Sequence, residues 1–149
     1  MIFFLLFMKR MVKKGDRDLS PCPLQLRLEQ LPYFNLADII CAVPSSKPFM
    51  KDIISALKGF NFTDVSDKIS WANKNDSLKN AETSEDKLKM IDTWGLTIDA
   101  SLDLKGKTIL LVDDMYQSGI TMQYVAMKLK DAGVKRVFGM TLCKALGNN

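Results

Sequence analysis

The first clear hydrophobic pattern in the chain is a short apolar run at residues 38–43 (DIICAV), which ends at Pro44. Continuous apolar residues over this length are typical of a strand buried on both faces. A loop at 45–48 (SSKP) follows, with candidate helix caps and a proline for a first helical position. Apolar residues then recur at helical spacing, at Met50, Ile53, Ile54 and Leu57. The pattern predicts a strand, a tight loop and a helix that ends near Gly59.

The same order of elements returns in the last third of the chain. A turn is predicted at 103–107 and a buried strand at 108–112 (TILLV). A loop at 113–120 leads to a helix with apolar residues at Met122, Val125, Ala126 and Leu129. This helix is predicted to end at Gly133, and a last strand is predicted at 136–143. Strands that alternate with helices predict an α/β domain with a mostly parallel sheet and flanking helices.

The remaining segments carry weaker patterns. Residues 1–8 (MIFFLLFM) are apolar but too few to span a bilayer, so a buried strand or helix start is expected instead of a membrane anchor. Leucines within 24–31 are spaced for a helix that stops at Pro32. The stretch 66–92 alternates lysines with acids and has few large apolar residues, which predicts a flexible loop or linker. A strand is predicted at 94–98.

Length and composition fit one domain: the chain has 149 residues, of which 47% are hydrophobic and 26% charged. Because the apolar run at 1–8 resembles an element that is missing its beginning, we expect the single domain at 1–149 to lack part of its N-terminal region. The net charge of +4 comes mostly from lysine. It suits an anionic metabolite, and a solvated lysine surface explains it equally well. Arginines are few, so no feature supports a nucleic-acid role.

Several kinds of chemistry are excluded by the residues that the chain lacks. There is no histidine, which excludes nucleophile–histidine triads and histidine metal sites. Cys22, Cys41 and Cys143 are odd in number and far apart, so neither a disulfide framework nor a zinc knuckle is indicated. We therefore expect a cytoplasmic protein without a membrane segment.

The candidate site is the segment that joins the strand at 108–112 to the following helix. In parallel sheets, ligands collect beyond the carboxyl ends of strands, where helix N-termini present unpaired N–H groups. The strand delivers Asp113 and Asp114 to this edge, and the loop offers Ser118, Gly119 and Thr121 where the helix begins. Carboxylates accept hydrogen bonds from ribose hydroxyls, while amides and hydroxyls donate to phosphate. The spacing is suited to a sugar at one end and its phosphate at the other.

An apolar strand that ends in two acids also occurs in sites of other kinds. A Walker B strand needs a Walker A loop, but Ser101 stands where the opening glycine should precede Gly106 and Lys107. A receiver-type acidic cluster needs two more strands, and only one is predicted after Thr121. The simplest alternative is a helix cap followed by a turn glycine. A cap does not require two adjacent acids and a loop of hydroxyls around a glycine.

The segment LLVDDMYQSGIT resembles the phosphoribosyl pyrophosphate (PRPP) motif of type I phosphoribosyltransferases. The longer stretch 103–143 is similar in layout to the ComF-like branch of that family, and IICAVPSSKP at 39–48 is similar to its first core strand and loop. Two features depart from the branch. Gln117 and Ser118 stand where two threonines are common, and the zinc-binding cysteines found at the start of ComF-like proteins are absent.

The resemblance implies a role for each candidate residue. Asp113 and Asp114 hold the ribose hydroxyls in such a site. The 5-phosphate is held by the loop residues Tyr116, Gln117, Ser118, Gly119, Ile120 and Thr121. The loop after the first strand meets the pyrophosphate, which implies Ser45, Ser46 and Lys47, although Lys47 is equally well explained as a solvated lysine. The stretch 66–92 lies where type I enzymes carry a catalytic loop, and Lys74 and Lys79 are its candidate basic residues.

The activity implied by the resemblance is transfer of ribose 5-phosphate from PRPP to a nitrogen nucleophile, with release of pyrophosphate. Mg²⁺, bound mainly through PRPP, is the implied cofactor, and nucleotide metabolism and a homodimer are implied as well. A non-catalytic PRPP or nucleotide sensor on the same fold is the main alternative. A protein-binding module with a vestigial site is a third. The acceptor is not indicated by any residue of the chain.

Overall fold

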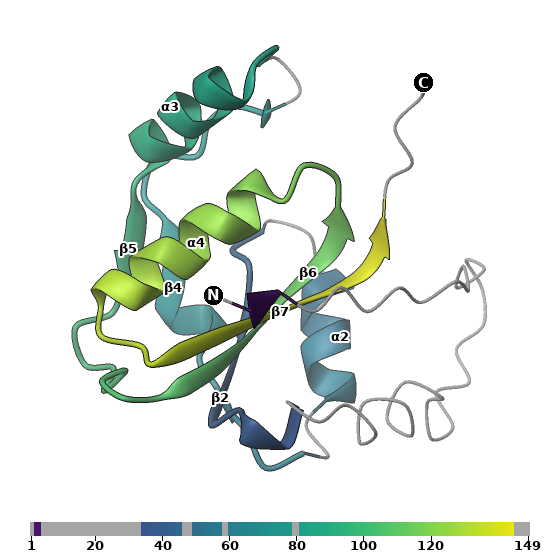
Figure 1. The fold of residues 1–149 in the computed structure, drawn as a ribbon, viewed down its shortest axis with the longest axis vertical. Coiled ribbons are helices and arrows are strands. Elements are labelled where there is room, and N and C mark those ends of the chain that lie inside the picture. The colour runs from purple at the N-terminus through teal and green to yellow at the C-terminus, as the bar shows by residue number, and fades with distance from the viewer. Residues whose placement is uncertain (1, 4–33, 46–48, 58–59, 79–80, 145–149) are drawn as a thin grey trace.

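The computed structural model describes residues 2–3, 34–45, 49–57, 60–78 and 81–144. Its main sheet has five parallel strands in the order β1-β7-β6-β2-β3 (Figure 1). The strands are β1 (Ile2–Phe3), β2 (Ile39–Ala42), β3 (Thr63–Asp64), β6 (Thr108–Tyr116) and β7 (Arg136–Lys144). A mostly parallel sheet with flanking helices was predicted, and the structure confirms it.

Two helices cover opposite faces of this sheet, because alternate residues of each buried strand point to opposite sides. On one face, α4 (Ile120–Asp131) packs with Val125, Ala126 and Leu129 against strand residues such as Leu111. On the other face, α2 (Phe49–Ala56) packs with Met50, Ile53 and Ile54 against strand residues such as Leu110. Both helices and the strands β2 and β7 agree with the elements predicted from apolar spacing.

A smaller antiparallel pair of strands, β4 (Ile69–Trp71) and β5 (Leu96–Ile98), lies on the α4 side of the sheet (Figure 1). In the sequence, α3 (Ser84–Trp94) comes between these two strands. Its residues Ile91 and Trp94 pack against the start of α4. Two short 3-10 turns, η1 (Phe34–Leu36) and η2 (Ser66–Lys68), complete the described elements.

The stretch 66–92 was predicted to be a flexible loop or linker, and the structure shows regular elements in it. It contains η2, β4 and most of α3, because Ile69 and Ile91, together with Trp94 at the end of α3, pack against the domain and are each at most 2% exposed. Motion of the segment stays a prediction. The predicted strand at 94–98 begins two residues late, since Trp94 ends α3 and Gly95 turns the chain with a φ of 62°.

Two other predictions concern the beginning of the chain. Of the apolar run 1–8, the structure describes only β1, which pairs in parallel with β7. This pairing agrees with the strand that was one of the two expected structures. The predicted helix within 24–31 lies outside the described residues. Among the residues that are described, no helix is long and apolar enough to cross a membrane.

Candidate functional site

The candidate site lies at the carboxyl edge of the sheet, where β2 ends beside Val112 of β6. The chain leaves β2 through α2 toward β3, and it leaves β6 through α4 toward β7 in the opposite direction. Such a reversal of direction is where open α/β sheets bind ligands. The Val43 backbone N–H donates to the Val112 carbonyl oxygen at 2.8 Å, so the loop after β2 begins alongside the middle of β6.

The two acids lie inside β6 and not in the loop after it. The strand was predicted to end at Val112, but it continues to Tyr116 because β7 pairs with it as far as Lys144. Beyond Val112, β6 pairs only with β7 in the part of the chain that the structure describes, so its other edge faces the loop after β2. Asp113 and Asp114 are therefore held on regular backbone at the rim of the sheet.

Both acids are half-buried, and strand alternation places them on opposite faces. Asp113 follows Leu111 on the face that α4 covers, and Asp114 follows Val112 on the face that α2 covers. The Asp113 Oδ1 accepts a hydrogen bond from the Asp114 backbone N–H at 2.9 Å, which orients the Asp113 carboxylate. Thr141, the register partner of Asp113 on β7, is buried, and its Oγ1 has no hydrogen-bond partner among the described residues. The rim therefore carries polar groups on both sides of the sheet.

The loop between β6 and α4 has the geometry expected of a phosphate-binding turn. Gly119 has a φ of 71° and a ψ of −2°, and it stands as the N-cap of α4. Within the described residues, no side chain caps this helix N-terminus, so its first N–H groups are directed at the loop. A Cβ on Gly119 would lie 2.5 Å from the Tyr116 Cε2 atom, because the tyrosine ring rests against the glycine. Only glycine fits at this position without displacing the ring.

The other predicted phosphate-loop residues differ in exposure. Gln117 and Ser118 are exposed and Thr121 is half-buried, so their polar groups can reach a ligand above the loop. Ile120 is different, since only 8% of it is exposed and its side chain packs with Trp94 and Tyr124. If Ile120 takes part in binding, it does so through its backbone N–H.

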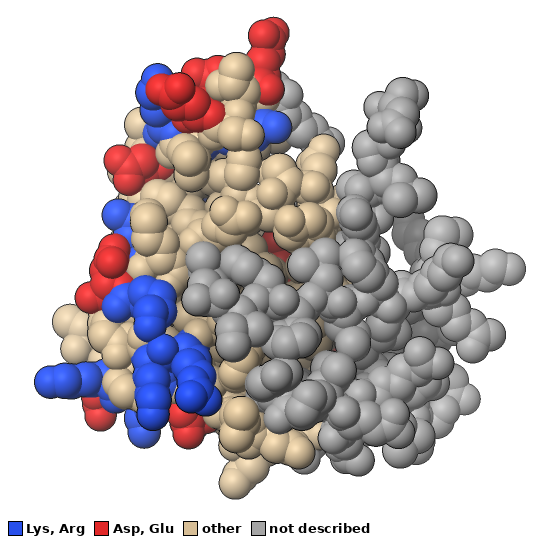
Figure 2. Space-filling view, in the orientation of Figure 1, with Lys and Arg blue, Asp and Glu red and all other residues tan. Residues whose placement is uncertain are grey.

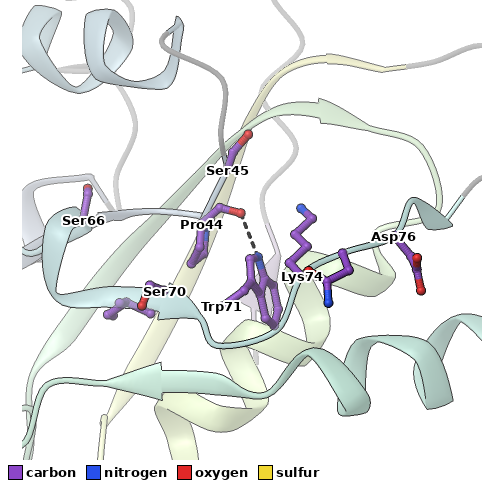
Figure 3. Close-up of a pocket in the computed structure, with 9 residues that line it drawn as sticks. Pro44, Ser45, Ser66, Ser70, Trp71, Lys74 and Asp76 are labelled. Atoms are coloured by element: carbon purple, nitrogen blue, oxygen red, sulfur yellow. Dashed lines mark hydrogen bonds between the residues drawn. The ribbon is translucent and has the colours of Figure 1, made fainter.

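On the other side of the site, the loop after β2 borders a cavity of about 420 Å³ (Figure 3). Ser45 lines this cavity, whereas Ser46 and Lys47 lie outside the described residues. The opposite wall comes from the segment after β3. The described lining consists of Pro44, Ser45, Ser66, Ile69, Ser70, Trp71, Lys74, Asn75 and Asp76. The structure therefore places Lys74 and Ser45 on the lining of the same cavity, while Lys79 is not among the described residues.

The sequence analysis missed two residues that hold this wall in place. The Trp71 Nε1–H donates to the Pro44 carbonyl oxygen at 2.8 Å, and the Ser66 Oγ accepts from the Ala42 backbone N–H at 2.9 Å. Trp71 could have attracted attention as one of only two tryptophans, standing in an otherwise polar stretch. Nothing in the pattern around Ser66 indicated its contact.

Several of the described basic residues gather on the surface away from the site. In Figure 2, lysine and arginine atoms gather over the end of α4 and the start of β7, and acidic atoms gather over α3. Lys130, Lys135 and Arg136 are exposed at the amino end of the sheet, opposite to the site. For these residues, a solvated surface explains the net positive charge better than a bound metabolite does. Among the described residues, no three acids or cysteines cluster as a protein-only metal site requires.

A parallel sheet with a glycine turn at a helix N-terminus beside its switch point defines the class of the protein as an open α/β domain, and such domains commonly bind ligands at this place. The family model of the phosphoribosyl transferase domain matches residues 32–147, most of the chain. The chain therefore belongs to the phosphoribosyl transferase domain family, and this confirms the family predicted from the sequence. The ComF-like branch is a narrower prediction that the match does not address.

Solved structures similar to this chain come from the same class. One is an asparagine mutant from an analysis of an invariant aspartic acid in HPRTs, 19% identical with a TM-score of 0.47, covering 76% of this chain and 54% of that one. Another is Trypanosoma cruzi hypoxanthine phosphoribosyl transferase, 17% identical with a TM-score of 0.46, covering 81% of this chain and 57% of that one. The chain thus spans little more than half the length of these proteins. No curated protein sequence matches it.

Proposed function

We propose that the protein transfers ribose 5-phosphate from PRPP to a nitrogen nucleophile and releases pyrophosphate. The observation that carries the proposal is Gly119. Its positive φ and its contact with the Tyr116 ring form a turn at the N-terminus of α4, directly after two acids at the rim of the sheet. Helix N–H groups and a glycine without a Cβ are suited to a phosphate, and the adjacent carboxylates are suited to the hydroxyls of its sugar.

We assign each predicted residue a role in binding PRPP. Asp113 and Asp114 accept hydrogen bonds from the ribose hydroxyls, reaching the ligand from the two faces of β6. The α4 N-terminus and the loop from Tyr116 to Thr121 bind the 5-phosphate. Ser45, Ser46 and Lys47 bind the pyrophosphate, and the exposure of Ser45 beside the cavity is consistent with that part.

In the reaction, the acceptor nitrogen forms a bond to the ribose C1 as the bond from C1 to the pyrophosphate oxygen breaks. The electron pair of that bond leaves with pyrophosphate, and the nitrogen loses a proton. No covalent enzyme intermediate is needed, so the absence of histidine is no obstacle. Catalysis rests on holding the two reactants in line and on carboxylates near the positive charge that develops on the ribose.

Mg²⁺ fits the residues that are present. Magnesium keeps several waters and is commonly bound through one or two carboxylates together with substrate phosphates, so it needs no cage made by the protein alone. The half-buried pair Asp113 and Asp114 can supply such carboxylates through ordered water or directly. The ion would neutralise charge on pyrophosphate as it leaves.

Other parts of the proposal rest on the resemblance. Membership of the ComF-like branch is supported by the layout of 103–143, where a Lys-Gly-Lys turn, the β6 strand and α4 follow in order. We also propose a cytoplasmic homodimer that acts in nucleotide metabolism.

A thermal-shift panel tests the proposed function. PRPP, ribose 5-phosphate, nucleoside monophosphates and pyrophosphate are each added with and without Mg²⁺. We expect PRPP with Mg²⁺ to raise the melting temperature most, because a ligand that binds only the folded state stabilises it. Product formation with a panel of amines and nucleobases then separates an enzyme from a sensor, which binds PRPP without turnover. No shift with any of these ligands would contradict a PRPP site of either kind.

A further inference from the structure

The segment after β3 contacts the carboxyl end of β2 through two side chains. The Ser66 Oγ accepts from the Ala42 backbone N–H at 2.9 Å, and it also donates to the Asp64 Oδ1 at 2.7 Å. Five residues later, the Trp71 Nε1–H donates to the Pro44 carbonyl oxygen at 2.8 Å (Figure 3). Together these bonds fix the backbone immediately before Ser45, where the proposed pyrophosphate loop begins.

The Trp71 ring is itself held by groups from two helices. The Trp94 ring of α3 meets it edge to face, with centroids 5.4 Å apart, and the Tyr124 ring of α4 lies 6.1 Å away. The Lys74 ammonium lies 5.9 Å from the Trp71 centroid and 4.8 Å from the Trp94 centroid. Tyr124 is one helical turn beyond the phosphate loop. The Trp71 ring therefore connects the loop after β2 with the helix that begins at the phosphate loop.

The indole N–H groups of the two tryptophans differ in their hydrogen bonding, so Trp94 can serve as a control for Trp71. Both rings belong to the same aromatic contact. The Trp71 indole N–H has a backbone partner, whereas the Trp94 indole N–H is buried and has no hydrogen-bond partner among the described residues. Loss of the N–H group should therefore affect the loop after β2 at Trp71 and leave it unchanged at Trp94.

We infer that Trp71 is a positioning residue that holds Pro44 and Ser45, the start of the loop after β2, in place for binding the pyrophosphate end of PRPP. The inference rests on the proposed function for its ligand. Trp71 acts through the Pro44 carbonyl group, so it needs no contact with PRPP. Its hydrogen bond stabilises one position of the Pro44 peptide group in the free protein, which lowers the cost of fixing the neighbouring Ser45 when PRPP binds.

The test compares Trp71→Phe with Trp94→Phe in the full chain. Each variant loses an indole and keeps an aromatic ring, but only Trp71→Phe loses the bond to Pro44. Amide hydrogen exchange of a peptide that covers residues 41–50 is measured without ligand. Affinities for PRPP, pyrophosphate and ribose 5-phosphate are measured by calorimetry with Mg²⁺. We expect faster exchange in Trp71→Phe alone, and PRPP and pyrophosphate binding weakened by about 3- to 10-fold, the size of one lost neutral hydrogen bond, with ribose 5-phosphate unchanged.

If either variant does not fold, a tryptophan analogue provides a second test. Both tryptophans are replaced during expression by a benzothienyl analogue, which keeps the ring shape and has sulfur in place of the N–H group. Because Trp94 makes no such bond to a described residue, the exchange and affinity changes should match those of Trp71→Phe.

The outcomes separate this inference from the proposed function. If exchange at 41–50 is the same in wild type, Trp71→Phe and the analogue protein, Trp71 does not hold the loop, whatever the protein binds. If exchange rises but all three ligands weaken equally, or Trp94→Phe has the same effect, the role is structural and the inference is wrong. If wild type binds neither PRPP nor pyrophosphate, the proposed function fails, and with it the part of the inference that concerns a ligand.

Discussion

At Gly119, both the backbone conformation and the neighbouring Tyr116 ring require a residue without a Cβ atom. The φ of 71° at Gly119 strains any other residue, and a Cβ would meet the Tyr116 ring at 2.5 Å. We expect Gly119→Ala to destabilise the protein by about 1–3 kcal/mol and to abolish ribose 5-phosphate binding, since the methyl group shifts the ring or the turn. Urea unfolding and calorimetry measure the two effects.

Gly106 provides a matched control for this substitution. It has a similar φ of 74°, but a Cβ there has no atom within 4 Å, and it lies in the turn before β6. Gly106→Ala should show the backbone strain alone and bind ribose 5-phosphate normally. Equal loss of stability in the two variants, with ligand binding retained in Gly119→Ala, would show that close approach at Gly119 is not required.

The buried thiol of Cys41 should make the stability of the protein depend on pH. Cys41 is fully buried in β2, and burial, followed by the nearby Asp64 carboxylate, raises the pKa of its thiol from 9.0 to about 12. Folding therefore favours the protonated thiol. Below about pH 9 both states are protonated and the thiol makes no difference; between about pH 9 and 12 the unfolded state loses its proton first, so stability falls as pH rises.

The check uses a Cys22→Ser, Cys143→Ser background, in which Cys41 is the only thiol. At pH 8 a thiol reagent should not react with the folded protein and should react at once in urea. Between pH 9 and 12, Cys41→Ala in the same background should lose less stability than its parent. Rapid labelling of the folded protein would contradict the burial of β2.

At the scale of elements, the segment 66–92 is where structure and sequence pattern differ most. Strands β2 and β6 and helices α2 and α4 could be predicted because each buries a regular set of apolar residues. Helix α3 could not, since it buries only Ile91 and Trp94 and leaves Leu88 46% exposed. Its packing depends on Ile120 and Tyr124 of α4, which lie far away in sequence. The length of β6 likewise depends on pairing with β7.

The structure indicates which lysine of this segment trypsin should reach first. Lys87 and Lys89 lie within α3, and Lys68 lies in η2 with its ammonium 3.4 Å from the Asp99 carboxylate. Lys74 is exposed on irregular backbone between β4 and α3. Limited trypsin digestion should therefore cut after Lys74 before the other three, because proteases need locally extended backbone.

PRPP with Mg²⁺ should slow that cut if the segment closes over the ligand to exclude water, as an enzyme of this kind requires. Lys74→Gln serves as the control, since it should remove the early fragment. First cleavage within α3 would contradict the described helix. Equal cutting at Lys74 with saturating PRPP would favour a sensor over an enzyme.

At the scale of the whole molecule, the candidate site is formed by two distant parts of the chain that meet at the switch point of the sheet. The acids and Gly119 could be proposed from the sequence because they are close together in it and their residue types suggest their chemistry. Trp71 and Ser66 could not, because their contacts with the loop after β2 depend on how β3 and β4 are placed. The prediction of a strand ending before the acids failed for the same reason: pairing with β7 is not encoded locally.

Calorimetry of PRPP with Mg²⁺ tests whether the end of β6 forms a PRPP site. Wild type is compared with Asp113→Asn, Asp114→Asn and the double variant. We expect the double variant to fold, with an unchanged circular dichroism spectrum, and to lose about 2–4 kcal/mol of PRPP binding free energy, because charged acceptors for ribose hydroxyls are removed. Each single variant should lose part of this, since the acids approach from opposite faces of β6. Unchanged PRPP affinity in the folded double variant would contradict the proposed PRPP site.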